Sequence, residues 1–148
     1  LPKRGERMTY LGGTAAHQLD TKNRIRIPAN YRAALGKEYF FLAGSQGCIF
    51  VYSKEALEEK LKEFDNINNG DKKKMLAKRK IQSAIFPVEE DTQGRVTVSQ
   101  FLRNHAGITR DLITVGMGTH LEIWAKERYV SDVDDQMSLD DAYEALGF

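Results

Sequence analysis

Residues 19–36 read LDTKNRIRIPANYRAALG, and residues 90–107 read EDTQGRVTVSQFLRNHAG. Laid over each other at a shift of 71 residues, they agree at five positions: Asp20/Asp91, Thr21/Thr92, Arg24/Arg95, Arg32/Arg103 and Gly36/Gly107. At a shift of 72, FVYSKE (50–55) lies over EIWAKE (122–127). Similarity at a nearly fixed spacing is the signature of an internal repeat. The sequence therefore predicts two copies of a unit of about 45 residues.

Each copy predicts the same local structure. Ile25 and Ile27 alternate with basic residues, as expected for a half-buried strand. Asn23 and Gly94 share one slot in the turn before that strand, and these residue types best tolerate a positive φ. A short helix should follow, with Pro28 in its first turn in copy one and Ser99 as its N-cap in copy two. Two strands joined by a glycine-containing turn should close each copy, at 39–43 and 48–52 and at 112–115 and 120–124.

Helical patterns fill the rest of the chain. We expect helices at 54–64 and 71–83, the second capped by Asp71, and an acidic amphipathic helix from Ser138 to about Gly147. The predicted organisation is a loose basic arm (1–7), a first repeat (8–54), a helical connector (55–83), a second repeat (84–126) and a C-terminal helix with an acidic tail (127–148). The predicted fold class is mainly β with short helices (α+β), with the two repeats forming an intramolecular pseudo-dimer around a shared core.

Composition and charge limit the class of protein. With 148 residues and 41% hydrophobic residues, the chain can bury a real core. It has no apolar run of about 20 residues and no signal-peptide pattern, and its single Cys48 cannot form an intrachain disulfide, so we expect a cytoplasmic protein. Residues 1–80 carry 17 Lys/Arg and 9 Asp/Glu (+8), and residues 81–148 carry 5 and 12 (−7). This asymmetry indicates that one half meets a polyanion, with nucleic acid the first candidate.

The turn from Asp20 to Arg24 has two interpretations. A salt bridge could merely hold the turn together, and at an exposed site such a pair contributes about 0–1 kcal/mol. The density of cations around it favours DNA instead, because arginine can grip phosphates or read guanine. The predicted DNA-binding residues are Lys22, Arg24, Arg26, Arg32 and Arg95. The predicted turn-orienting residues are Asp20, Asn23, Asp91 and Gly94.

These motifs resemble those of bacterial MraZ proteins. The resemblance rests on the duplicated Asp-x-x-x-Arg, the string LD-x-K-x-R-I-x-I-P, the segment GCIFVY and the block HAGITRDLITVG…LEIW, and it spans about residues 8–130. It implies tandem AbrB-type swapped-hairpin units and a sequence-specific DNA-binding regulator at the division and cell-wall gene cluster. It also implies ring-shaped homo-oligomers and association with the nucleoid, with Asp20 to Arg24 as the reading turn and Arg95 as its counterpart. Asn23 departs from the family's usual glycine, and the resemblance gives no counterpart for the tail beyond Val130.

Two other classes of function compete with this one. An enzyme has little support, because the three histidines are far apart and no zinc spacing, P-loop or nucleophile motif occurs. We therefore expect no catalysis, cofactor or metal, no membrane partner, and a surface or turn position for His17. An antitoxin that holds a toxin with the acidic segment 131–148 is the second alternative. The lysine-rich stretch 72–80 is expected to be a solvated face, and double-stranded DNA with short direct repeats is the expected partner.

Overall fold

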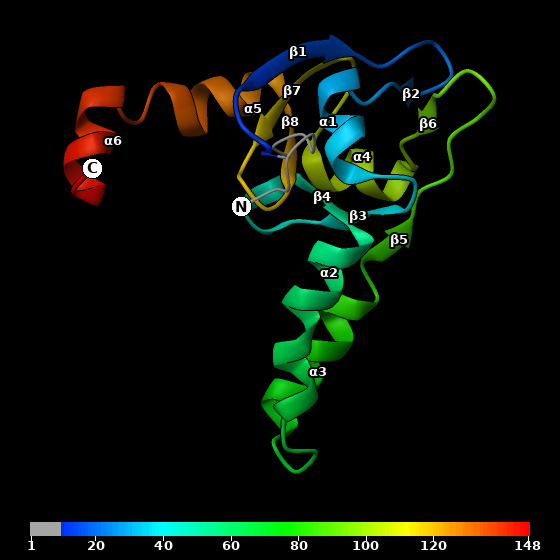
Figure 1. Ribbon diagram of the computed structural model, residues 1–148, viewed down its shortest axis with the longest axis vertical. Helices are drawn as coiled ribbons and strands as arrows, with labels where there is room; N and C mark the ends of the chain where they lie inside the picture. Colours follow the sequence, from blue (N-terminus) through cyan, green and yellow to red (C-terminus); the bar gives the residue numbers. More distant parts are fainter. Residues whose placement is uncertain (1–9) are drawn as a thin grey trace, which may run out of the picture.

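A six-stranded antiparallel sheet is the framework of the computed structural model, which describes residues 10–148 (Figure 1). Its strands lie in the order β1-β7-β8-β4-β3-β5. Their bounds are β1 Thr14–Gln18, β3 Tyr39–Ala43, β4 Ile49–Ser53, β5 Ile85–Pro87, β7 Asp111–Gly116 and β8 Leu121–Ala125. The predicted arm at 1–7 lies outside the described residues.

The strand order shows that the two copies exchange their first strands. Strand β1 belongs to the first copy but pairs with β7 of the second, with Ala15 opposite Thr114. In the same way β5 of the second copy pairs with β3 of the first, with Phe86 opposite Phe41. Strands β4 and β8 join the copies at the centre of the sheet. The prediction of two tandem swapped repeats in an α+β chain with short helices is therefore confirmed. The helices within residues 54–82 and those at the C-terminal end make the chain less dominated by strands than expected.

A second, two-stranded ladder lies apart from the sheet. It pairs β2 (Arg24–Ile25) with β6 (Val96–Thr97), one strand from each copy. The alternation is as predicted, because four side chains are at most 2% exposed: Ile25, Ile27, Val96 and Val98. Strand β2 is shorter than the predicted one, since Pro28 follows Ile27 at once and precedes α1 (Ala29–Leu35) instead of lying in its first turn. This helix and α4 (Gln100–Ala106) bury their apolar sides in the same core.

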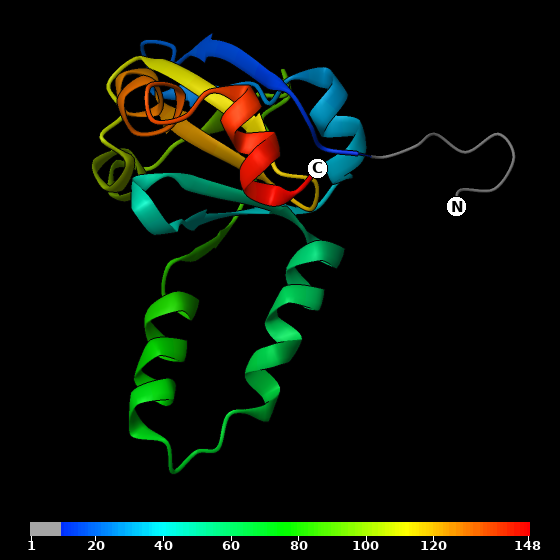
Figure 2. The same cartoon turned by 90° about the vertical axis from the view of Figure 1, so that its left-hand side faces the viewer.

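The predicted helix caps are present. The side chains of Ser99, Asp71 and Ser138 each accept a hydrogen bond from a backbone N–H in the first turn, at 3.3, 3.0 and 3.1 Å. Helix α2 (Lys54–Leu61) continues as the 3-10 helix η2 (Lys62–Asn66), and α3 (Lys72–Gln82) returns to the sheet. We call residues 54–82 the helical hairpin. It projects well beyond the sheet (Figure 2).

The chain ends in a series of helical segments. Helix α5 (Lys126–Tyr129) runs into a π-helical turn, η3 (Val130–Asp134), and after a break comes α6 (Leu139–Leu146). The helix predicted from Ser138 is thus present, and it buries none of its residues. In Figure 1 it lies beside the sheet, on the side away from β2 and β6. No helix within residues 10–148 is both long and apolar enough to cross a membrane.

Candidate nucleic-acid interface

The first turn is built on the carboxylate of Asp20. Its Oδ1 accepts the backbone N–H groups of Lys22 at 2.8 Å and Arg24 at 2.9 Å, and its Oδ2 accepts Nε–H of the Arg24 guanidinium at 2.8 Å. Asn23 has a φ of 59°, as predicted for this slot. Desolvation raises the pKa of Asp20, but the hydrogen bonds from Arg24 and Lys22 outweigh it, so the net pKa lies below its ordinary value. The carboxylate therefore fixes the shape of the turn and the direction of the arginine together.

The second turn repeats the first almost atom for atom. Oδ1 of Asp91 accepts the backbone N–H groups of Gln93 and Arg95, each at 2.9 Å, and Oδ2 accepts Nε–H of Arg95 at 2.8 Å. Gly94 has a φ of 74°. The hydrogen bond from the Arg95 backbone is the main cause that holds the pKa of Asp91 below its ordinary value. The sequence repeat is thus a repeat of hydrogen bonding.

The two turns lie side by side at one end of the molecule (Figure 1). The Arg24 guanidinium lies 3.8 Å from Oδ2 of Asp91, and Nε–H of Arg26 donates to the backbone oxygen of Gln93 at 3.1 Å. A cleft of about 380 Å³ runs between the turns and is lined by His17, Gln18, Asp20, Arg24, Ile25, Arg26 and Arg95. We call this the arginine cleft. Three of the five predicted DNA-binding residues line it, one of them from the second copy.

The positive charge is concentrated on the first turn. Residues 20–26 carry three Lys/Arg and one Asp (+2), whereas residues 91–97 carry one Arg and one Asp (0). The Lys22 side chain is exposed, and the side chains of Arg24 and Arg95 are 22% and 27% exposed. The two turns therefore have the same backbone shape and hydrogen bonds, but the first turn attracts an anion more strongly.

Arg32 lies in a different setting from the other candidates. Its guanidinium donates to both carboxylate oxygens of Glu90, at 3.0 and 2.7 Å, and the Tyr39 hydroxyl donates to the same carboxylate at 2.7 Å. The hydrogen bonds from Arg32 are the main cause that lowers the pKa of Glu90. We call this network of Arg32, Glu90 and Tyr39 the latch. When the two copies are aligned, Leu19 occupies the position of Glu90, so the latch exists in one copy only. Arg32 and Arg103 occupy the same position of the repeat, so the sequence alone did not reveal that Arg32 pairs with a carboxylate, whereas Arg103 donates to a backbone oxygen.

His17 is half-buried in a strand and lines the arginine cleft, so the expectation of a turn position is wrong. It lies in β1, and its Nε2 is 2.6 Å from the Oγ1 of Thr114, whose side chain is fully buried. The corresponding residues in the other half of the sheet are Val88 and Phe41, so the pair replaces an apolar contact. Burial also lowers the pKa of His17. Since the hydroxyl is buried, the pair presents no nucleophile to solvent.

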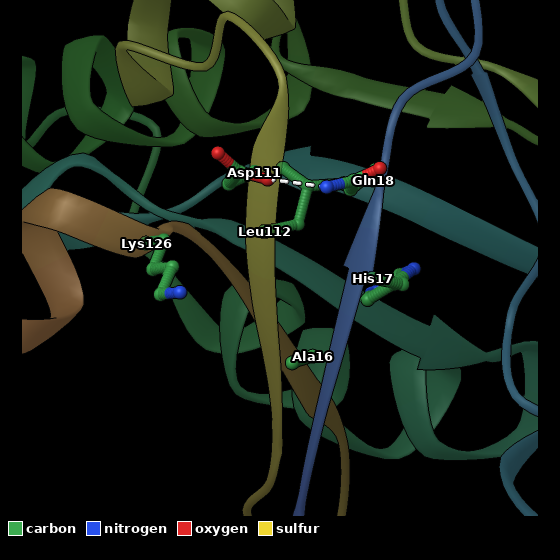
Figure 3. A pocket seen from close by; sticks show the side chains of 6 residues that line it. All are labelled: Ala16, His17, Gln18, Asp111, Leu112 and Lys126. Carbon is green, nitrogen blue, oxygen red and sulfur yellow. Dashed lines mark hydrogen bonds between the residues drawn. The ribbon is translucent and has the colours of Figure 1, made fainter.

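The surface around β1 and β7 carries one further hollow. This cavity of about 310 Å³ is lined by Ala16, His17, Gln18, Asp111, Leu112 and Lys126. Figure 3 shows the amide of Gln18 reaching the carboxylate of Asp111 across the two strands, at 2.8 Å. Across the described part of the chain, no group of three or more His, Cys, Asp or Glu residues is arranged to hold a metal ion.

Comparison with known proteins identifies the family. Residues 10–80 and 85–146 both match a family model described as MraZ protein and antitoxin-like. Proteins named transcriptional regulator MraZ from Lachnoclostridium phytofermentans and Clostridium acetobutylicum are 34% and 40% identical to this chain, covering 84% and 80% of it and 88% and 83% of their own lengths. A protein of the same name from Clostridium beijerinckii is 34% identical over 90% of this chain and 94% of its own length. The match extends to residue 146, so the tail beyond Val130 does have a counterpart, contrary to our expectation. The chain therefore belongs to the MraZ family.

Proposed function

We propose that this protein is a sequence-specific DNA-binding transcriptional regulator that reads duplex DNA with the arginine cleft. The observation that carries the proposal is the placement of Arg24, Arg26 and Arg95 along one cleft, two of them held by a carboxylate. The relatives named above are transcriptional regulators by name, which supports the same function. Such a regulator would act in the cytoplasm, at the nucleoid.

The cleft provides two kinds of contact with DNA. A guanidinium has five N–H donors in a rigid plane, and Arg24 gives one of them to Asp20. The remaining donors are enough for a bidentate contact with O6 and N7 of a guanine in the major groove. Lys22 and Arg26 are exposed beside it and suit phosphates, which position a protein on the duplex. In this proposal Asp20 and Asp91 orient the arginines, while Asn23 and Gly94 supply the backbone turns.

Arg32 has an indirect part in the same proposal. Its two hydrogen bonds to Glu90 tie α1 to the residue before the second turn. Two of its five N–H donors are given to Glu90, and the remaining donors of this part-exposed side chain could contact a phosphate. We therefore propose that the main role of Arg32 is to position the second turn, and that contact with DNA is a secondary role.

The target follows from the resemblance to MraZ proteins. We propose the promoter of the division and cell-wall gene cluster, with short direct repeats each bound by one chain of a ring-shaped homo-oligomer. Because the first turn carries most of the charge, each chain should contribute one strong contact and one weaker contact.

A footprint on the DNA upstream of the protein's own gene tests the function. We expect protection of short direct repeats by the wild-type protein, and loss of protection with Arg24→Ala. Protection that is indifferent to sequence would refute specific reading, and an unchanged footprint with Arg24→Ala would refute the arginine cleft as the reading surface.

An antitoxin is the second candidate, because the matched family is described as antitoxin-like. The tail that would hold a toxin is not fully extended, since residues 139–146 form helix α6. Copurification of a small toxin at equal stoichiometry, lost when residues 131–148 are removed, would favour this candidate over a regulator acting alone.

A further inference from the structure

Helix α6 and the residues before it form an acidic amphipathic segment without a partner in the described chain. Residues 131–148 contain six Asp/Glu and no Lys/Arg, a formal charge of −6. The apolar side chains of Leu139, Tyr143 and Leu146 are 68, 45 and 86% exposed. Their spacing of four and three residues places them on one face of the helix. Asp140 lies three residues before Tyr143 and so borders that face, and Glu144 lies one turn further along on the same side of the helix as Asp140.

Helix α3 is oppositely charged and, like α6, exposes apolar side chains next to charged ones. Residues 72–82 contain six Lys/Arg and no Asp/Glu, a formal charge of +6, and bury none of their side chains. Leu76 is 66% exposed, and Ile81 near the end of the helix is 44% exposed. Cations occupy the positions three and four residues before and after Leu76, namely Lys72, Lys73, Arg79 and Lys80. On a helix these positions surround Leu76, so an apolar centre lies within a basic rim.

We propose that α6 of one copy of this chain packs along α3 of a second copy. An apolar centre with a polar rim is the general anatomy of a protein interface. Helix α3 carries six cations over eleven residues, whereas α6 carries three carboxylates over eight residues, with three more in residues 131–138 before it. The two segments are therefore opposite in charge. Opposite potentials on two surfaces select the partner and orient it.

Two other surfaces, the arginine cleft and an apolar groove between β5 and α4, could also be considered as binding sites for α6, but they fit it less well. The arginine cleft is basic, but the exposed side chains that flank it are Lys22 and Arg26, with no exposed apolar residue to meet Leu139 or Leu146. A groove of about 520 Å³ between β5 and α4 is apolar, with Phe86 and Phe101 in its wall, but Glu89 also lines it. A carboxylate there would repel a segment of charge −6.

The partner is a second copy because the two helices of one chain are held apart. Helix α6 lies beside the sheet in Figure 1, and the helical hairpin extends away below the sheet in both views (Figures 1 and 2). Helix α6 also lies away from the two turns, so the contact leaves the arginine cleft open for DNA (Figure 1).

Charge reversal with rescue tests the proposal. Two variants, Lys73→Glu/Lys80→Glu on α3 and Asp140→Lys/Glu144→Lys on α6, should each weaken self-association in sedimentation velocity by about tenfold, because exposed ion pairs are individually weak and each reversal replaces attraction with repulsion. A chain with all four changes should recover the wild-type association. The control Lys60→Glu/Lys62→Glu reverses two exposed cations on the same hairpin but outside α3, and should leave association unchanged. Unchanged association in the α3 or α6 variant, or no recovery in the fourfold variant, overturns the proposal.

Cross-linking identifies the second copy directly. Ala77→Cys on α3 and Ala142→Cys on α6 are placed in two differently tagged chains, and a short bismaleimide should join one chain of each kind. The native Cys48 is buried and burial raises its pKa to about 12, so it should not react. Glu59→Cys on α2 in place of Ala77→Cys is the control and should give no mixed product. A chain that carries both cysteines and cross-links only within itself places α6 on its own α3 and overturns the proposal.

Electrophoretic mobility shifts with DNA distinguish the docking of α6 on α3 from two other possibilities: failure of the proposed DNA-binding function, and binding of DNA to α3. Arg24→Ala should lose DNA binding but keep self-association, whereas Asp140→Lys/Glu144→Lys should lose self-association first. If Lys73→Glu/Lys80→Glu weakens DNA binding while sedimentation is unchanged, DNA occupies α3 and the docking proposal is wrong.

Discussion

Replacing Arg24 by alanine is the most direct test of the arginine cleft. The change removes a guanidinium that gives one of its five N–H donors to Asp20 and lies 3.8 Å from Oδ2 of Asp91. A bidentate arginine contact with guanine contributes about 1–3 kcal/mol of discrimination. We therefore expect the affinity for the operator to fall by roughly 5- to 150-fold.

Arg95→Ala should have a smaller effect, although Arg95 has the same hydrogen bonds to its own carboxylate. The difference arises from the neighbours, since Lys22 and Arg26 flank Arg24, whereas Gln93 and Thr97 flank Arg95. Folding should survive both changes, because the buried residues of the ladder, Ile25 and Val96, are untouched. Lys37→Ala is the control, as it removes an exposed cation beside the Glu38–Lys54 ion pair at the base of the helical hairpin.

Mobility-shift titrations at fixed salt, paired with thermal melts, measure both effects. Equal losses of affinity from Arg24→Ala and Arg95→Ala would refute the reasoning from charge and mean that the two turns contribute alike. A loss from Lys37→Ala as large as that from Arg24→Ala would refute the cleft as the site of reading.

Four further outcomes are expected. Because the folded-state pKa values of Asp20 and Asp91 lie below the ordinary value of 3.8, their stabilising effect is present above that pH and is lost as the pH falls through the lower values; thermal melts of Asp20→Asn/Asp91→Asn should thus depend less on pH in this range than wild type. The logarithm of affinity should fall with the logarithm of salt concentration with a slope of about −0.9 per phosphate, for roughly 2–4 phosphates per chain, and a slope near zero would exclude DNA as the partner. Direct repeats should bind better than inverted ones, and an insertion of about 5 base pairs between them should weaken binding more than one of about 10. Gly116→Ala should lower the free energy of unfolding by about 1–3 kcal/mol in denaturant titrations, because its Cβ would lie 2.5 Å from Cα of Gly12.

Repetition made most of the fold predictable. Two copies of the same signals located the turns, both short helices and the paired strands, and a single mechanism explained Asn23 and Gly94 in one slot. The family resemblance implied swapped hairpins, but strands β1 and β5 themselves were not predicted, because local pattern says nothing about which copy a strand pairs with.

Differences between the copies were less predictable. The latch of Arg32, Glu90 and Tyr39 depends on side chains 51 and 58 residues apart in sequence, and such contacts leave no periodic signal. The contact of His17 with Thr114 was equally unpredictable, since an isolated polar residue in a short edge strand gives no hint of a hydroxyl from β7. The repeat indicated where the copies correspond, but the function of each position depended on its neighbours in space.

Because the two copies exchange strands, the chain could be cleaved at the tip of the helical hairpin without separating the two halves of the sheet. A single cut near Gly70 would leave two pieces, each of which holds a strand that completes the other's half of the sheet. The nicked molecule should stay together as an intact particle, and the two pieces made separately should reassemble when mixed. Each piece holds one copy of the repeat. A swapped homodimer could thus have become a single chain simply by gaining a linker between two copies.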